Sequence, residues 1–243
     1  MNRLSPRFAQ VVTATVAVLM TMLMSFPRAA LAVDGVIEIN QARVIAAGGF
    51  PFKIISFGSY RLTSNLSVNS AADGIDVNAS YVDIDLNGFA IVVNTANLGI
   101  NGTGTNVTVH DGKVLNTSTA CAIQLRDSSV VRNVITFGSC GIEVGNNSAV
   151  AGSVAQNCLF GIIAGDNSRI SGNTVNGNRS EGISVTSGGL VVDNVIAGNS
   201  GSGLDCGGST TTGYARNIFT SNSPNVTGCT NLGENLCDGK ICP

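Results

Sequence analysis

Apolar residues recur in a fixed pattern along most of this chain. A small residue is followed by an aliphatic residue and, in all but one segment, by a second apolar residue two places on. Seven segments carry the pattern, and their first aliphatic residues are Ile75, Ile100, Ile123, Ile142, Ile162, Ile183 and Leu204. The i, i+2 spacing predicts a short strand with one buried face in each segment. The interval of 19 to 25 residues predicts a solenoid whose coils bury their apolar faces against one another.

A second apolar cluster follows each of these segments, as at 82–86, 107–109 and 191–195. We therefore expect two or three strands per coil, separated by corners rich in Asn and Gly, which tolerate left-handed backbone angles. Two series of small polar residues recur at the same intervals as the aliphatic residues from Ile75 to Leu204, which we call the aliphatic column. We expect the side chains of these polar residues to hydrogen-bond from coil to coil. They are Asn157, Asn178 and Asn199, and Asn133, Ser153, Asn173, Asn194 and Asn217.

These features resemble the right-handed parallel β-helix family, the pectate-lyase-like solenoids, over about residues 58–223. The resemblance rests on the period, the Gly-Ile-x-Val strands, the Asn corners and the segment 82–89 (Val-Asp-Ile-Asp-Leu-Asn-Gly-Phe). Segments 34–43 and 58–66 are similar to the N-terminal portion of secreted bacterial β-helix repeat proteins. The resemblance implies an all-β, right-handed parallel β-helix of about seven to eight rungs.

The exposed strand edge at each end of such a coil needs a cover. We assign residues 33–57 to an N-terminal cap, in which 37–47 form a short amphipathic helix, and residues 224–243 to a cysteine-containing C-terminal cap. Other repeat folds fit less well. A hexapeptide rhythm and repeated Gly-Gly-x-Gly-x-Asp do not occur, and leucine is too scarce for leucine-rich repeats.

The first 32 residues differ from the rest of the chain. Two arginines precede an uncharged apolar run over about 8–26, and residues 30–32 (Ala-Leu-Ala) supply the small residues that signal peptidase accepts. We therefore expect a secretory signal at 1–32 and a mature protein that is secreted, periplasmic or on the cell surface. An uncleaved membrane anchor is the alternative, because the run approaches the length that spans a bilayer.

Composition narrows the possible partners. Without residues 1–32 the chain keeps ten basic and fifteen acidic residues, a net charge of −5. Nucleic acid is therefore not an expected partner, because phosphate binding draws on clustered Lys and Arg. No later segment is apolar enough to cross a membrane, so we expect no membrane contact once the signal is removed. The remaining 211 residues suffice for one domain, which we expect to be monomeric.

All seven cysteines follow the predicted signal, where an oxidising compartment permits disulfides. Cys121 and Cys140 lie two residues before Ile123 and Ile142 of the aliphatic column, so they occupy equivalent positions in consecutive coils. We expect them to form a disulfide, with two stacked thiols as the alternative. The simplest scheme for the others pairs Cys206 with Cys229 and Cys237 with Cys242, and leaves Cys158 free. Cys237 and Cys242 have no neighbouring His or second Cys pair, so we expect no metal site.

Few residues offer catalytic chemistry. When the second apolar clusters of three successive coils are aligned, Asp85, His110 and Arg132 fall in register, and Asp83 lies on the same face. An acid, an imidazole and a guanidinium are candidate catalytic residues of a lyase. Such an enzyme removes a proton beside a carboxylate and stabilises the charge that develops. A ladder of paired charges on a solvated sheet is the alternative interpretation.

The known catalytic motifs of similar coils are missing. The chain has no adjacent Asp pair, no Gly-His-Gly and no Arg-Ile-Lys, the motifs of polygalacturonase-like members. The outward positions of the first strands form a thin polar series: Asp76, Asn101, Gln124, Glu143, Ile163, Ser184 and Asp205. We therefore predict a non-catalytic binding or structural module, without a cofactor, that contacts extended polymers such as polysaccharide. A polysaccharide lyase or epimerase acting on uronate-containing glycans is the alternative.

Overall fold

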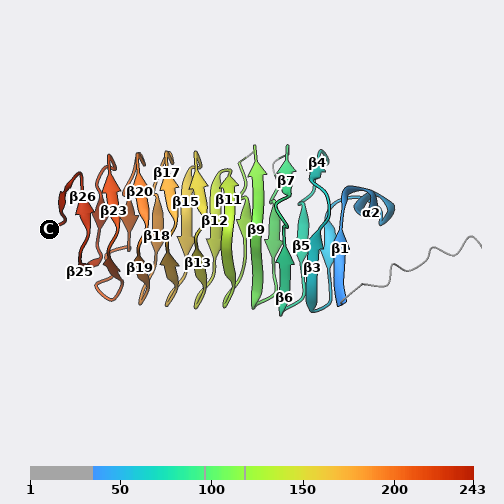
Figure 1. Ribbon diagram of the computed structural model, residues 1–243, viewed down its shortest axis with the longest axis horizontal. Helices are drawn as coiled ribbons and strands as arrows, with labels where there is room; N and C mark the ends of the chain where they lie inside the picture. Colours follow the sequence, from blue (N-terminus) through green and yellow to red (C-terminus); the bar gives the residue numbers. More distant parts are fainter. Residues whose placement is uncertain (1–34, 96, 118) are drawn as a thin grey trace, which may run out of the picture. The chain divides into compact units, whose positions relative to one another are not determined.

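The computed structural model describes residues 35–243 with the exception of 96 and 118, so the predicted signal at 1–32 lies outside the described residues. Within that part, short strands follow one another as the successive coils of a parallel β-helix (Figure 1). The nine strands of sheet 1 are β2 (Phe52–Ile54), β5 (Ile75–Val77), β8 (Ile100–Gly102), β10 (Ile123–Gln124), β12 (Cys140–Val144), β15 (Phe160–Ala164), β18 (Ile183–Val185), β21 (Leu204–Asp205) and β24 (Val226–Thr227).

The second sheet turns a corner within each coil, so its two halves are described separately. Sheet 2 contains β1 (Val36–Ile39), β3 (Gly58–Leu62), β6 (Val82–Asp85), the first parts of β9 (Val107–Asn116) and β11 (Val130–Phe137), β13 (Ala149–Ala151), β16 (Arg169–Ser171), β19 (Leu190–Val192), β22 (Gly213–Ala215) and β25 (Thr230–Gly233). Sheet 3 contains β4 (Leu66–Val68), β7 (Ala90–Val93), the second parts of β9 and β11, β14 (Val154–Gln156), β17 (Thr174–Asn176), β20 (Val195–Ala197), β23 (Ile218–Thr220) and β26 (Leu236–Cys237). A last strand, β27 (Lys240–Ile241), runs antiparallel to β26.

The predicted aliphatic column is confirmed. Its seven members lie in parallel register on sheet 1 from Ile75 to Leu204, and each is at most 1 % exposed. The small residue before each member is required by close packing. A Cβ atom added to Gly161 would lie 2.4 Å from the backbone oxygen of Gly182 in the next coil and 2.5 Å from Val175 Cγ1.

The coil has about nine turns, more than the seven to eight predicted. The additional coil comes from the segments assigned to the two caps. At the N-terminal end β1 pairs in parallel with β3, and β2 pairs in parallel with β5. In the segment assigned to the C-terminal cap, β24, β25 and β26 pair in parallel with β21, β22 and β23, so the winding runs from Val36 to Cys237.

The predicted N-terminal helix is shorter than expected. It is α2 (Gln41–Ala46), whereas 36–39 form a strand. Asn40 separates the two elements because its backbone is extended and its side chain accepts a hydrogen bond from the backbone N–H of Arg43, which caps the helix. Val44 of α2 is fully buried in the core. Among the described residues, no helix is long and apolar enough to span a bilayer.

Two ladders of buried amides connect the later coils, as predicted. Each side-chain oxygen accepts a hydrogen bond from the backbone N–H of the equivalent residue one coil earlier, at 2.9–3.1 Å. The first ladder runs through Asn173, Asn194, Asn217 and Asn235, and the second through Asn178, Asn199 and Asn222. Each coil is thereby held to its neighbour at two corners.

The prediction was wrong by one residue at the start of both ladders. Val134 and Cys158 occupy the ladder positions that were assigned to Asn133 and Asn157, because their backbone N–H groups bond to Ser153 Oγ and Asn178 Oδ1. Asn133 and Asn157 instead take left-handed φ angles of 54° at the preceding corner. Asn tolerates that conformation, so both sites suit it equally well by residue type.

The cysteine scheme is confirmed throughout. Disulfides join Cys121 to Cys140, Cys206 to Cys229, and Cys237 to Cys242. The free cysteine is Cys158, which is fully buried, and burial raises the pKa of its thiol to about 11. The bond between Cys121 and Cys140 links two consecutive coils directly, with the two α-carbons 4.3 Å apart.

Candidate functional site

The structure brings the three candidate catalytic residues together on the outer face of sheet 2. Asp85 of β6 pairs with His110 of β9, and His110 pairs with Arg132 of β11, as the sequence alignment predicted. Arg61 of β3 precedes Asp85 in the same register and was not identified from the sequence. An outward column of ionisable side chains, Arg61, Asp85, His110 and Arg132, therefore crosses four consecutive coils.

Direct contacts within the column link only some of its members. Arg61 Nε donates to Asp85 Oδ2 at 2.8 Å, whereas His110 Nδ1 lies 3.9 Å from Asp85 Oδ1. The residue that follows His110 makes the closest contact to the imidazole, since Asp111 Oδ2 lies 2.7 Å from Nδ1. Arg132 Nη1 approaches Asp111 Oδ2 at 3.9 Å. Arg132 thus adjoins the imidazole through Asp111.

The imidazole is enclosed by carboxyl groups. Its second nitrogen, Nε2, lies 3.3 Å from Asp83 Oδ2, and only 11 % of the His110 side chain is exposed. Asp111 occupies a corner with a φ of 58°, which turns its carboxylate back toward the preceding residue. Hydrogen bonds from Asn133 and His110 lower the pKa of Asp111, so this carboxyl stays ionised below its usual range.

This arrangement is poorly suited to proton abstraction from a substrate. A general base needs a nitrogen or oxygen that reaches the substrate proton, but both nitrogens of His110 already face carboxylate oxygens. Two cavities in the described part of the chain, within 116–179 and 47–53, are not lined by Asp85, His110 or Arg132. The charged cluster formed by Asp83, Asp85, His110, Asp111 and Arg132 resembles a paired ladder more than an open catalytic site.

A different set of polar groups lies on sheet 1, where the predicted outward series is in register from Asp76 to Asp205. Burial raises the pKa of Asp76, and the adjacent Asp73 carboxyl raises it further. Asp73 in turn accepts hydrogen bonds from the amide of Asn101 at 2.9 Å and from the backbone of Leu98 at 2.8 Å. Asp73 and Asp76 are therefore neighbouring carboxyls on this face, and burial together with the proximity of Asp73 holds the pKa of Asp76 above its usual value.

Sheet 3 carries a feature that the sequence analysis did not identify. Its outward positions form an aliphatic column in parallel register, interrupted once by Thr174: Ile135, Val154, Thr174, Val195, Ile218 and Leu236. Val195, Ile218 and Leu236 are each 42–45 % exposed. We call this column the aliphatic stripe. The sequence contains its signal in strands such as Val195-Ile196 and Ile218-Phe219, where both faces are apolar.

A second column beside the aliphatic stripe is more polar. The register of sheet 3 places Leu115, Phe137, Gln156, Asn176 and Ala197 on successive coils. Phe137 is 37 % exposed. The face of sheet 3 thus presents a run of aliphatic side chains next to an aromatic ring and two amides.

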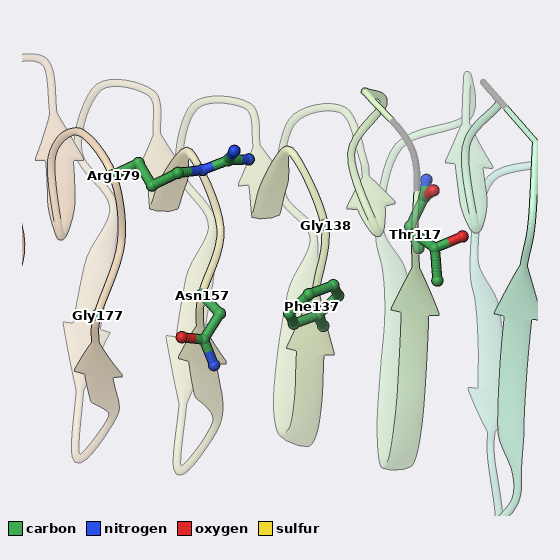
Figure 2. A pocket seen from close by; sticks show the side chains of 7 residues that line it. Thr117, Phe137, Gly138, Asn157, Gly177 and Arg179 are labelled. Carbon is green, nitrogen blue, oxygen red and sulfur yellow. The ribbon is translucent and has the colours of Figure 1, made fainter.

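A cavity of about 330 Å³ lies where this second column meets the corner after sheet 3. It is lined by Asn116, Thr117, Phe137, Gly138, Asn157, Gly177 and Arg179. Figure 2 shows Phe137 at the end of β11, between Thr117 of the coil before and Asn157 of the coil after. The Arg179 side chain extends across the rungs, past the coil that carries Asn157 and toward the coil of Phe137 (Figure 2).

The cavity combines several binding chemistries. Phe137 offers an aromatic surface, Arg179 an exposed guanidinium, and Asn157 and Thr117 exposed polar side chains. The Asn116 side chain is fully buried and donates to the backbone oxygens of Asn97 and Cys121, which fixes the corner beneath the cavity. No protein-family model matches the chain, and no curated protein sequence matches it.

Proposed function

We propose that the protein is an exported member of the pectate-lyase-like β-helices that binds extended polysaccharide without cleaving it. The observation that carries this proposal is the outer face of sheet 3, where the aliphatic stripe runs beside Phe137, Gln156 and Asn176 and ends at the cavity with Arg179. Adjacent coils are about 4.8 Å apart, so the stripe from Ile135 to Leu236 extends roughly 24 Å.

The chemistry of this face favours sugar over a purely apolar partner. A sugar ring has an apolar C–H face, which packs on aliphatic and aromatic side chains, and a rim of hydroxyl groups that hydrogen-bond to amides. Sheet 3 supplies both kinds of group in adjacent columns with a constant spacing. An extended polymer meets the same surface at each coil, and the guanidinium of Arg179 adds an attraction for a carboxylate-bearing unit.

Export is supported by the three disulfides, which persist in oxidising compartments. Together with the apolar run and the Ala-Leu-Ala segment at 30–32, they favour removal of residues 1–32 and a location in the periplasm, on the cell surface or outside. A monomer is sufficient for this function, because one chain carries the whole face.

The binding proposal is tested by co-sedimentation of the mature protein with insoluble neutral and acidic polysaccharides and with cell-wall fractions. We expect retention on at least one polymer, and at least tenfold weaker retention of Phe137→Ala and of Arg179→Ala. Phe57→Ala is the matched control, since Phe57 is 80 % exposed and lies outside the cavity lining. Failure to bind any polymer, or equal retention of all variants, contradicts the proposal.

The alternative, a lyase that uses Asp85, His110 and Arg132, has narrower support. It is favoured by the register that brings the three side chains onto one face, and disfavoured by the engagement of both imidazole nitrogens. Lyase products absorb ultraviolet light because they are unsaturated. An absorbance increase on a uronate polymer that disappears in His110→Ala would replace the binding function with the enzymatic one.

A further inference from the structure

The charged cluster on sheet 2 has the composition of a metal site. One donor atom each from Asp85, His110 and Asp111 lies within 4.8 Å of the other two. Two of these residues are consecutive in β9, and the third is their neighbour in β6. The sequence analysis expected no metal site, because it did not recognise that the left-handed φ of Asp111 returns its carboxylate to the imidazole.

We propose that Asp85, His110 and Asp111 bind a divalent first-row transition metal ion, with Zn²⁺ as the reference cation. The ligand atoms are Asp85 Oδ1, His110 Nδ1 and Asp111 Oδ2. Zinc binds nitrogen and carboxylate oxygen at about 2.0–2.2 Å, so tetrahedral ligands are separated by roughly 3.3 Å. The observed separations from Nδ1, 2.7 Å to Asp111 and 3.9 Å to Asp85, lie on either side of that value.

Each proposed ligand is held by a partner on the atom that faces away from the metal. Arg61 donates to Asp85 Oδ2 at 2.8 Å, and the Asn133 amide donates to Asp111 Oδ1 at 3.0 Å. Asp83 Oδ2 lies 3.3 Å from His110 Nε2, so it is placed to accept the proton of that nitrogen when a cation binds the Nδ1 lone pair. Such outer partners fix the tautomer and the ligand orientation in protein metal sites.

The contact between His110 Nδ1 and Asp111 Oδ2 marks the place of the proposed ion. Without metal, a neutral imidazole with its proton on Nδ1 donates to Asp111 Oδ2 at 2.7 Å. A metal ion takes the place of that proton, and the imidazole then carries its proton on Nε2, which faces Asp83 Oδ2 at 3.3 Å.

The donor set selects among metals. Calcium and magnesium prefer sites made of oxygen alone, whereas an imidazole with carboxylates suits Zn²⁺, Ni²⁺, Co²⁺ or Cu²⁺. Three protein ligands leave a coordination position for water. Two guanidinium groups compete with a bound cation: Arg61 Nε lies 2.8 Å from Asp85 Oδ2, and Arg132 Nη1 lies 3.9 Å from Asp111 Oδ2. Arg61 contacts the Asp85 oxygen that is not a proposed ligand, and 44 % of the Arg132 side chain is exposed, so Arg132 moves into solvent when a cation binds.

The test uses the mature full-length protein, dialysed against chelator and titrated calorimetrically with ZnCl₂. We expect saturable binding of one equivalent, loss of that binding in His110→Ala, and 10- to 100-fold weaker binding in Asp83→Ala. Asp205→Ala, which removes an acid on sheet 1, is the matched control and should bind as the wild type does. Circular dichroism of each metal-free variant verifies that the coil is intact.

A second measurement uses the fact that the chain has a single histidine. The imidazole resonances of the wild type should shift with one equivalent of Zn²⁺ and broaden with one equivalent of Co²⁺. Unchanged resonances, or Zn²⁺ binding that persists in His110→Ala, overturn the proposal. Those results would mean that hydrogen bonds of the imidazole to Asp83 and Asp111 account for the cluster without an ion. Polysaccharide retention does not depend on this outcome, since the cavity lies on sheet 3.

Discussion

Replacement of Asn194 by alanine is the sharpest test of the amide ladders. Asn194 Oδ1 accepts hydrogen bonds from the backbone N–H and the side-chain amide of Asn173, at 2.9 and 3.0 Å. Its Nδ2 donates to the backbone oxygens of Ile170 and Val192 and to Asn217 Oδ1, at 2.9–3.0 Å. The side chain is 1 % exposed, so water does not replace these bonds.

The magnitude follows from the groups left without partners. Asn194→Ala orphans the buried backbone N–H of Asn173, at a cost of about 1–3 kcal/mol, and removes further hydrogen bonds worth about 0.5–1.5 kcal/mol each. Asn173 Nδ2 keeps its bond to Val150 O and Val192 O keeps the N–H of Gly172, which limits the loss. We expect the free energy of unfolding to fall by about 3–5 kcal/mol.

Urea unfolding followed by circular dichroism measures this loss. Because a solenoid can unfold in parts, labelling of the buried Cys158 thiol gives a second, local probe. Asn94→Ala is the matched control: Asn94 is exposed, and its amide makes a single bond, to Asn69 at 2.8 Å, so its removal should cost less than about 0.5 kcal/mol. Equal losses in the two variants would refute the role assigned to the ladder.

Two other changes test the packing and the electrostatics of sheet 1. Gly161→Ala places a methyl group 2.4 Å from the Gly182 backbone oxygen, so the urea midpoint should drop by the equivalent of about 2 kcal/mol or more; an unchanged midpoint contradicts the packing argument. Asp76→Asn should raise the melting temperature at pH 7. The pKa of Asp76 is raised by burial and by Asp73, so its stabilising contribution is complete below its unfolded pKa, near 3.8, and is lost as the pH rises through its folded pKa. The gain should vanish near pH 3, and a gain that is the same at both pH values would show that the ionisation of Asp76 is not its cause.

The coil itself follows from the sequence because its physical requirement is local and repeated. Each coil needs an aliphatic residue at the stacking position and a small residue before it, so the recurrence of this pair every 19 to 25 residues from Ile75 to Leu204 determines the register. The same register places Asp85 beside His110 and Cys121 beside Cys140. Contacts between side chains at equivalent positions of consecutive strands are therefore predictable from the sequence.

Positions that depend on the corners are less predictable. Asn occupies both the left-handed corner and the buried ladder, so Asn133 and Asn157 could not be distinguished by type from Asn173 and Asn178. In the coil of Asn157 the loop is one residue shorter. Gly161 follows the ladder residue Cys158 by three residues, whereas Gly182 follows the ladder residue Asn178 by four. The contact between the Asp111 carboxylate and the His110 imidazole was missed for a similar reason. It requires a positive φ at Asp111, whereas side chains of consecutive residues on a regular strand point to opposite faces.

The two proposed sites use the repeated backbone in different ways. On sheet 3 the register repeats one kind of contact, so the aliphatic stripe grows with the number of coils and suits a polymer that also repeats. On sheet 2 the register joins unlike residues, so Asp85, His110 and Asp111 converge once and suit a single ion. The parallel register thus produces an extended surface on sheet 3 and a single compact site on sheet 2. A variant of either site should therefore leave the other intact, because no lining residue of the cavity belongs to the metal cluster.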